Sequence, residues 1–284
     1  MSSKDQLVGI AREHLPAGVV EQWTGLLKPA VRLAHATGDD AVAGHLGGDA
    51  ELPPDMPWPA WEGYGPLSLW LSLDCAALPA GELALPDSGR LLFFLFDGQL
   101  CESTAPYIGD DGPESRGAHR VVYVPEGTPT SLREAPAELR HRVPAEPLTA
   151  SVIWTAPQYP DDLDAWHARY GEPDEAASRA LYDDGFDDEL DLWGRAARQL
   201  GGHPFAPQSP VEEDLARYVV FAGAERSGPE LRREIARWRL LLQFMPDYET
   251  GLWCGDTNYL YWFITADDLA ARRFDRARLL RQDT

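Results

Sequence analysis

Several apolar runs in this sequence are too continuous to be strands that keep one face in water. Two of them are residues 67–73 (LSLWLSL) and 91–96 (LLFFLF). A strand with one wet face alternates apolar and polar side chains, whereas a strand covered on both faces is apolar almost throughout. We therefore expect sheets that are packed on both sides.

The order of the predicted elements indicates an α+β fold. Strands are predicted near both ends of the chain, at 30–34, 67–73, 91–96, 120–124, 148–154, 239–245, 259–264 and 277–281. Helices are predicted at 7–14, 17–28, 175–182, 187–199, 211–218, 229–235 and 266–272. A Gly- and Pro-rich stretch at 37–66 predicts a long irregular loop.

These elements predict packed, mainly antiparallel β-sheets in one unit over residues 1–284. Residues 1–28 form an N-terminal helical segment, and residues 157–235 form an acidic helical insertion. Strand 67–73 ends at Asp74 and strand 239–245 is followed by Asp247, and each leads through a polar loop into an apolar strand. This echo fits a weak internal duplication or a coincidence, and both remain open.

The charge of the chain argues against several classes of partner. It has 25 Lys and Arg against 46 Asp and Glu, a net charge of −21. Nucleic acids and anionic lipids are bound through Lys and Arg, so we expect no nucleic-acid and no membrane partner. The N-terminal residues lack a secretory pattern, and the three widely spaced cysteines fit a reducing compartment. We therefore expect a cytoplasmic protein.

The acidic residues are concentrated in one segment. Residues 161–191 contain twelve acidic and two basic side chains, a net charge of −10. Such a segment is either a solvated helical face or a docking surface for a basic protein.

Familiar catalytic and cofactor motifs are missing from the sequence. It contains no phosphate-binding loop, no dinucleotide-binding glycine turn, no G-x-S-x-G and no H-E-x-x-H. Its cysteines and histidines also lack the spacing of a zinc site. We therefore expect no cofactor and no metal ion.

Two tryptophans are candidates for a ligand-binding wall. Trp58 and Trp61 lie in the Gly- and Pro-rich loop, where tryptophan provides a large contact area. They are either packing anchors of the loop or part of a pocket.

Two polar turns carry the candidate reactive groups. Residues 201–208 (GGHPFAPQ) present His203, and residues 253–258 (WCGDTN) present Asp256. A lone histidine is more often structural than catalytic. Asp256 either belongs to a plain hairpin loop or directs its carboxylate into a cleft.

Short motifs along the chain carry a family resemblance. They are Gly47-Gly48, Leu52-Pro53-Pro54, Trp58-Pro59, Leu85-Pro86-Asp87-Ser88-Gly89, Gly201-Gly202-His203-Pro204, Leu240-Leu241-Leu242-Gln243, Gly255-Asp256 and Asp268-Leu269-Ala270. In this order, from about residue 29 to 281, they resemble the YwqG-like family of bacterial proteins of unknown function. The resemblance implies an α+β fold of packed β-sheets with helical insertions, and no established activity.

The chain departs from the family pattern at several positions. Ser72 stands where the family usually has Gln, Cys254 where Trp is expected, and Asn258 where Gly is common. His45-Leu46 replaces the Ser-Lys that often precedes the two glycines. If those family residues form a site, this chain lacks part of it, which counts against catalysis.

The first functional hypothesis is a non-enzymatic binding protein that recognises a basic protein partner. The net charge, the acidic segment and the missing catalytic motifs favour it, because opposite charges steer association. An immunity-type role against a basic, nucleic-acid-targeting toxin fits this chemistry.

The second hypothesis is an enzyme or a small-ligand-binding protein. Its pocket would lie between residues 45–66, 201–208 and 253–258, with His203 and Asp256 as acid and base. The remaining side chains of this predicted site are the orienting amides Gln208 and Gln243 and the walls Trp58, Trp61 and Trp253. The hypothesis requires that these distant segments meet in one cavity.

Overall fold

The computed structural model describes residues 2–96, 113–139, 142–158, 174–194, 196–221, 223–226, 228–246 and 258–283. The helices are α1 (Ser3–His14), α2 (Ala17–Thr24), α4 (Glu175–Leu181), α5 (Asp184–Gly194), α6 (Val211–Asp214), α7 (Gly228–Ile235) and α8 (Ala266–Ala270). Shorter helical turns are η1 (Cys75–Ala77), η2 (Pro113–Ala118), the π-helical η3 (Leu215–Val220) and η4 (Phe274–Arg276). Among the described helices, none is long and apolar enough to cross a bilayer.

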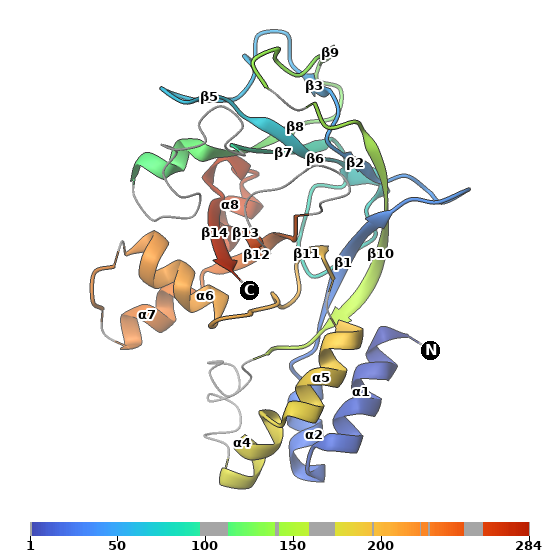
Figure 1. The fold of residues 1–284 in the computed structure, drawn as a ribbon, viewed down its shortest axis with the longest axis vertical. Coiled ribbons are helices and arrows are strands. Elements are labelled where there is room, and N and C mark those ends of the chain that lie inside the picture. Colours follow the sequence, from blue (N-terminus) through green and yellow to red (C-terminus); the bar gives the residue numbers. More distant parts are fainter. Residues whose placement is uncertain are drawn as a thin grey trace.

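Ten strands form one antiparallel sheet in the order β14-β13-β12-β11-β1-β10-β2-β6-β7-β8 (Figure 1). They are β1 (Lys28–His35), β2 (Gly44–Leu46), β6 (Ser68–Asp74), β7 (Arg90–Leu95), β8 (His119–Val124), β10 (Glu146–Thr155), β11 (Arg198–Leu200), β12 (Trp238–Phe244), β13 (Asn258–Thr265) and β14 (Arg278–Asp283). Two small sheets pair β3 (Ala50–Leu52) with β9 (Ser131–Arg133) and β4 (Ala60–Trp61) with β5 (Gly65–Pro66). The predicted α+β class and the mainly antiparallel pairing are confirmed.

The sheet consists of two halves of the same topology. In chain order, the first half contains β1-β2-β6-β7-β8 and the second half contains β10-β11-β12-β13-β14. The halves exchange their first strands, because β1 pairs with β11 of the second half and β10 pairs with β2 of the first half. The pairing register shifts at equivalent points, between Leu69 and Leu71 in one half and between Leu240 and Leu242 in the other.

Each half contains a turn formed by a pair of glycines, Gly47-Gly48 in the first half and Gly201-Gly202 in the second. All four glycines have a positive φ, between 57° and 80°. The side chain two residues before the first glycine donates a hydrogen bond to that glycine's carbonyl in both turns. The donor is His45 Nδ1 at 2.8 Å in the first half and Gln199 Nε2 at 3.0 Å in the second.

The second glycine of each pair packs closely on an alanine. A Cβ added at Gly48 would lie 2.8 Å from the Cβ of Ala145, and one added at Gly202 would lie 2.8 Å from the Cβ of Ala30. Matching topology, bulges and turns favour an internal duplication over coincidence.

The two halves share one apolar core. Trp70 of the first half packs on Phe244 of the second with ring centroids 5.2 Å apart, and Phe93 meets Trp262 at 5.8 Å. The outer face of the first half is covered by residues around Trp61, and that of the second by α6 and η3. The expectation that the apolar strands are buried on both faces is confirmed for β6 and β7.

A separate apolar cluster joins α1, α2, α4 and α5 at one end of the molecule (Figure 1). At its centre Trp23 packs edge-on against Phe186, with ring centroids 5.4 Å apart. The helices of the middle region therefore divide into this cluster and the α6–η3–α7 group on the second half.

Three sequence predictions are corrected by this arrangement. The helix predicted over 187–199 ends earlier, because residues 198–200 form β11 inside the sheet, and the insertion predicted over 157–235 is interrupted there. The loop predicted over 37–66 contains four short strands. Strands of two or three residues are too short to show an alternating pattern.

Replacing Gly202 by alanine tests the glycine turn. We expect Gly202→Ala to lower the free energy of unfolding by about 2–5 kcal/mol, because the cost of a positive φ for alanine adds to the cost of overpacking the added Cβ. Chemical denaturation measures the loss. The matched control is Gly63→Ala, which has a φ of 83° but open space around the added Cβ, so we expect about 1–2 kcal/mol. Equal losses at the two positions would contradict the close packing of the turn.

Candidate functional site

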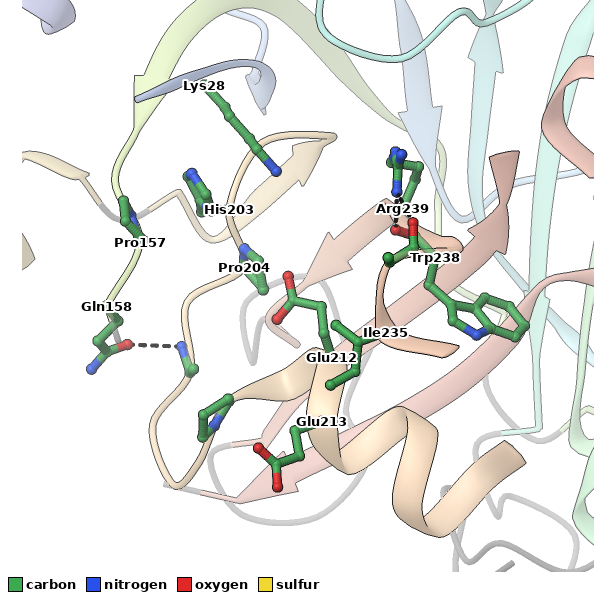
Figure 2. A pocket seen from close by; sticks show the side chains of 13 residues that line it. Lys28, Pro157, Gln158, His203, Pro204, Glu212, Glu213, Ile235, Trp238 and Arg239 are labelled. Carbon is green, nitrogen blue, oxygen red and sulfur yellow. Dashed lines mark hydrogen bonds between the residues drawn. The ribbon is translucent and has the colours of Figure 1, made fainter. Parts of the chain in front are cut away.

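A cleft of about 190 Å³ opens beside the second glycine turn (Figure 2). Five separate segments contribute its polar groups: Lys28 begins β1, Gln158 follows β10, His203 follows the turn, Glu212 and Glu213 lie on α6, and Arg239 lies on β12. The apolar walls are Pro157, Pro204, Ala206, Pro210, Ile235, Ala236 and Trp238. Apolar walls with a few convergent polar groups are typical of small-ligand sites.

His203 is buried and held by hydrogen bonds to Thr155 and Leu26. Its main-chain N–H donates to Thr155 Oγ1 at 2.8 Å, and its ring Nε2 lies 2.8 Å from the carbonyl oxygen of Leu26. Burial, aided by the charge of Lys28, lowers the pKa of His203 to about 3. The ring is therefore neutral near pH 7, with the proton on Nε2 and an acceptor lone pair on Nδ1.

Glu212 has an environment that disfavours its charge. Loss of water around the carboxyl group raises its pKa above the usual value, and the negative charge of Glu82 adds to this effect. Its own backbone N–H and the Lys28 amine oppose the shift without cancelling it. A ligand cation next to this carboxyl would favour the ionised form.

The two cations of the cleft are partly engaged with the protein. Lys28 Nζ lies 3.6 Å from Glu82 Oε1, and Glu82 Oε2 accepts the N–H of Gly202 at 3.1 Å. Arg239 Nη1 donates to the carbonyls of Ala236 and Trp238 at 2.9 and 2.7 Å. Each cation keeps further N–H groups for a ligand.

Figure 2 shows how these groups face one another. The Lys28 side chain extends toward the middle of the pocket from one side, and the Glu212 carboxyl from another. Among the described residues, no group of three His, Cys, Asp or Glu is arranged to hold a metal ion.

A family model described as a domain of unknown function, DUF1963, matches residues 44–282. The chain belongs to the DUF1963 family. No curated protein matches the chain. The DUF1963 match covers both glycine turns and most of the cleft but leaves out Lys28.

The structure separates the residues that the sequence grouped into one site. Gln243 is fully buried, accepts the N–H of Phe205 at 2.7 Å and donates to the carbonyl of Ala196 at 2.8 Å. It fixes the backbone behind the cleft. Gln208 is exposed and does not line the cleft, where Gln158 provides an amide instead.

Two of the three predicted tryptophan walls, Trp58 and Trp61, pack on the outer face of the first half. Trp58 Nε1 donates to the carbonyl of Leu67 at 2.8 Å, and Trp61 is buried and stacked on Tyr64 with ring centroids 4.0 Å apart. Neither lines the cleft of His203. Trp253 and Asp256 lie outside the described residues.

The surroundings of His203 favour a hydrogen-bonding role over the acid–base role that the sequence suggests. A ring with a pKa near 3 and one nitrogen committed to Leu26 is a fixed hydrogen-bond acceptor near pH 7. Sequence reasoning missed Lys28, Glu212 and Arg239. For Lys28 there was a signal, since it is one of only two lysines in an arginine-rich chain.

Glu212→Gln tests the electrostatics of the cleft. The folded state raises the pKa of this carboxyl, so its ionisation costs stability once the pH exceeds the unfolded pKa. We expect the variant to have a higher Tm than the parent at pH 8 and a smaller advantage at pH 4. Glu213→Gln is the control, because Glu213 pairs with Arg217 at 2.6 Å and should show no gain. A lower Tm for Glu212→Gln at pH 8 would contradict the assignment.

Proposed function

We propose that this DUF1963 protein binds a small ligand that carries both a protonated amine and a carboxylate, about the size of an amino acid. The observation that carries the proposal is Glu212, a poorly hydrated carboxyl whose pKa is raised, next to an open cleft. A ligand amine at this position would donate a charge-assisted hydrogen bond to the carboxylate and favour its ionised form.

The histidine gives the amine a second acceptor. With Nε2 directed at Leu26, the neutral His203 ring keeps Nδ1 as a hydrogen-bond acceptor. Because its ring is fixed and uncharged, it accepts from a donor without competing for a proton. Glu212 and His203 together therefore favour a ligand N–H group.

The cations on the other side of the cleft suit a carboxylate. Lys28 and Arg239 approach the same space and keep unused N–H groups. Pro204, Ile235 and Trp238 offer apolar contact to the body of the ligand. A cavity of about 190 Å³ lies below the roughly 300–1,000 Å³ of drug-sized sites, which favours a compact molecule.

The cytoplasmic location, the YwqG-like membership and a basic protein partner are proposals as well. The widely spaced cysteines support a cytoplasmic location, and the motifs support a YwqG-like member of DUF1963. Recognition of a basic protein through the acidic segment stays a separate prediction from charge, for which pull-downs at two salt concentrations are the test.

The experiment begins with a thermal-shift screen of the standard amino acids, followed by calorimetry on the best binder. Two analogues are compared with it, one without the amine and one without the carboxylate. We expect the complete molecule to bind at least about tenfold more tightly than either analogue, since each lost charged hydrogen bond costs about 1.5–3 kcal/mol.

Two variants assign the contacts. In Glu212→Gln, the complete ligand should no longer bind more tightly than the analogue without the amine. In Lys28→Met, it should no longer bind more tightly than the analogue without the carboxylate. Glu213→Gln, at the edge of the cleft, should bind like the parent. No binding in the screen, or unchanged selectivity in both variants, would overturn the proposal.

A further inference from the structure

A second and larger cavity lies where the edges of the two halves meet. It measures about 520 Å³ and lies between β8 of the first half and the η4 region of the second. The residues that matter for its chemistry are Trp58, Arg120, Tyr123, Arg272, Phe274 and Asp275. None of these lines the cleft of His203.

Positive charge gathers around this cavity although the chain as a whole carries −21. Arg120 and Arg272 line it directly. Burial lowers the pKa of Arg278 on β14, and the nearby Arg116 and Arg276 lower it further. Arg116 and Arg276 are therefore close enough to act on Arg278, and an anion bound nearby would relieve this repulsion.

The neighbouring His119 responds to the same charges. Burial lowers its pKa to about 3, and Arg278 and Arg120 contribute to the shift. The nearby acids offset only part of this charge: Asp268 is bound by Arg273 at 2.7 Å and also acts on Arg278, and Asp275 lies 3.9 Å from Arg276. The described part of the chain thus leaves excess positive charge beside the cavity.

Arg272 adopts a backbone conformation that favours glycine. Its φ is 55°, and it is the one described non-glycine residue with a positive φ. It follows α8, where its N–H donates to the carbonyl of Leu269 at 3.0 Å and the next N–H donates to Asp268 at 2.8 Å. Glycine usually occupies this position after a helix. An arginine here carries strain, which points to a use for its side chain.

The guanidinium group of Arg272 lies over an aromatic wall. Its Cζ is 5.8 Å from the centre of the Tyr123 ring, which in turn packs on Phe274. Trp58 forms another wall, fixed by its hydrogen bond to Leu67 and by edge contact with Phe94 at 5.5 Å. Fixed aromatic rings beside two arginines suit a planar group that bears a negative charge.

We infer that this cavity binds a small organic anion with a planar apolar group, held by Arg120 and Arg272 beside Trp58. The shared chemistry is an oxyanion, either a carboxylate or a phosphate ester, joined to a ring. The site is independent of the amino-acid cleft and does not rest on its function.

Calorimetry on the full chain tests the site with four probes. They are phenyl phosphate, benzoate, inorganic phosphate and the uncharged benzyl alcohol. We expect at least one of the two aromatic anions to bind, inorganic phosphate to bind at least tenfold more weakly than that anion, and benzyl alcohol to give no heat. Which aromatic anion binds better identifies the oxyanion. Equal binding of inorganic phosphate would overturn the planar-group assignment, and no binding by either aromatic anion would overturn the site.

Arg272→Gly separates a ligand contact from a structural role. Because glycine suits the backbone at this position, the variant should keep or raise the Tm while the aromatic anion binds about ten- to a hundredfold more weakly. Arg120→Gln should weaken binding similarly. The control Arg12→Gln removes an exposed charge on α1 and should leave binding unchanged, as should Glu212→Gln in the other cleft. Parent-like binding by both cavity variants, or an equal loss in Arg12→Gln, would overturn the inference.

Discussion

The shared core between the two halves is the contact on which the rest of the structure depends. Each half has a mostly apolar meander, and covering only its outer face would leave large aromatic side chains in water. Phe93 against Trp262 and Trp70 against Phe244 close the inner faces onto each other. One continuous sheet satisfies this requirement only if it bends around the central β1–β10 pair. That bend brings the edge strand β8 close to η4 and creates the second cavity.

The exchange of first strands brings Lys28, at the start of β1, to the cleft beside the second glycine turn. In each half the glycine pair packs against the central strands. This packing fixes the backbone position of the residue that follows the second glycine. In the second half this residue is His203, which lines the cleft with Lys28 of the exchanged strand. In the first half it is Asp49, whose Oδ1 accepts the N–H of Ala135 at 3.2 Å. The same backbone thus borders the cleft in one half and anchors a loop in the other.

The sequence predicted the long elements because burial on both faces leaves a continuous apolar run. It missed β2 and β11, since three residues show no period, although both directly precede a glycine pair. His203 was found from its turn, but its role depends on the Leu26 carbonyl, more than 170 positions away. Lys28, Glu212 and Arg239 are ordinary surface residue types, and only the folded sheet brings them together. Trp58 was predicted as a pocket wall, and the structure places it at the other cavity.

The central claim is that the cleft after the second glycine turn, and not its counterpart in the first half, binds the ligand. Backbone amide NMR during titration with the amino acid selected by the screen tests this claim most directly. The account predicts that the largest shifts occur at Gly202, His203, Glu212 and Trp238, while the amide of Asp49 stays unchanged. Shifts centred on Asp49, or spread evenly over the surface, would contradict it.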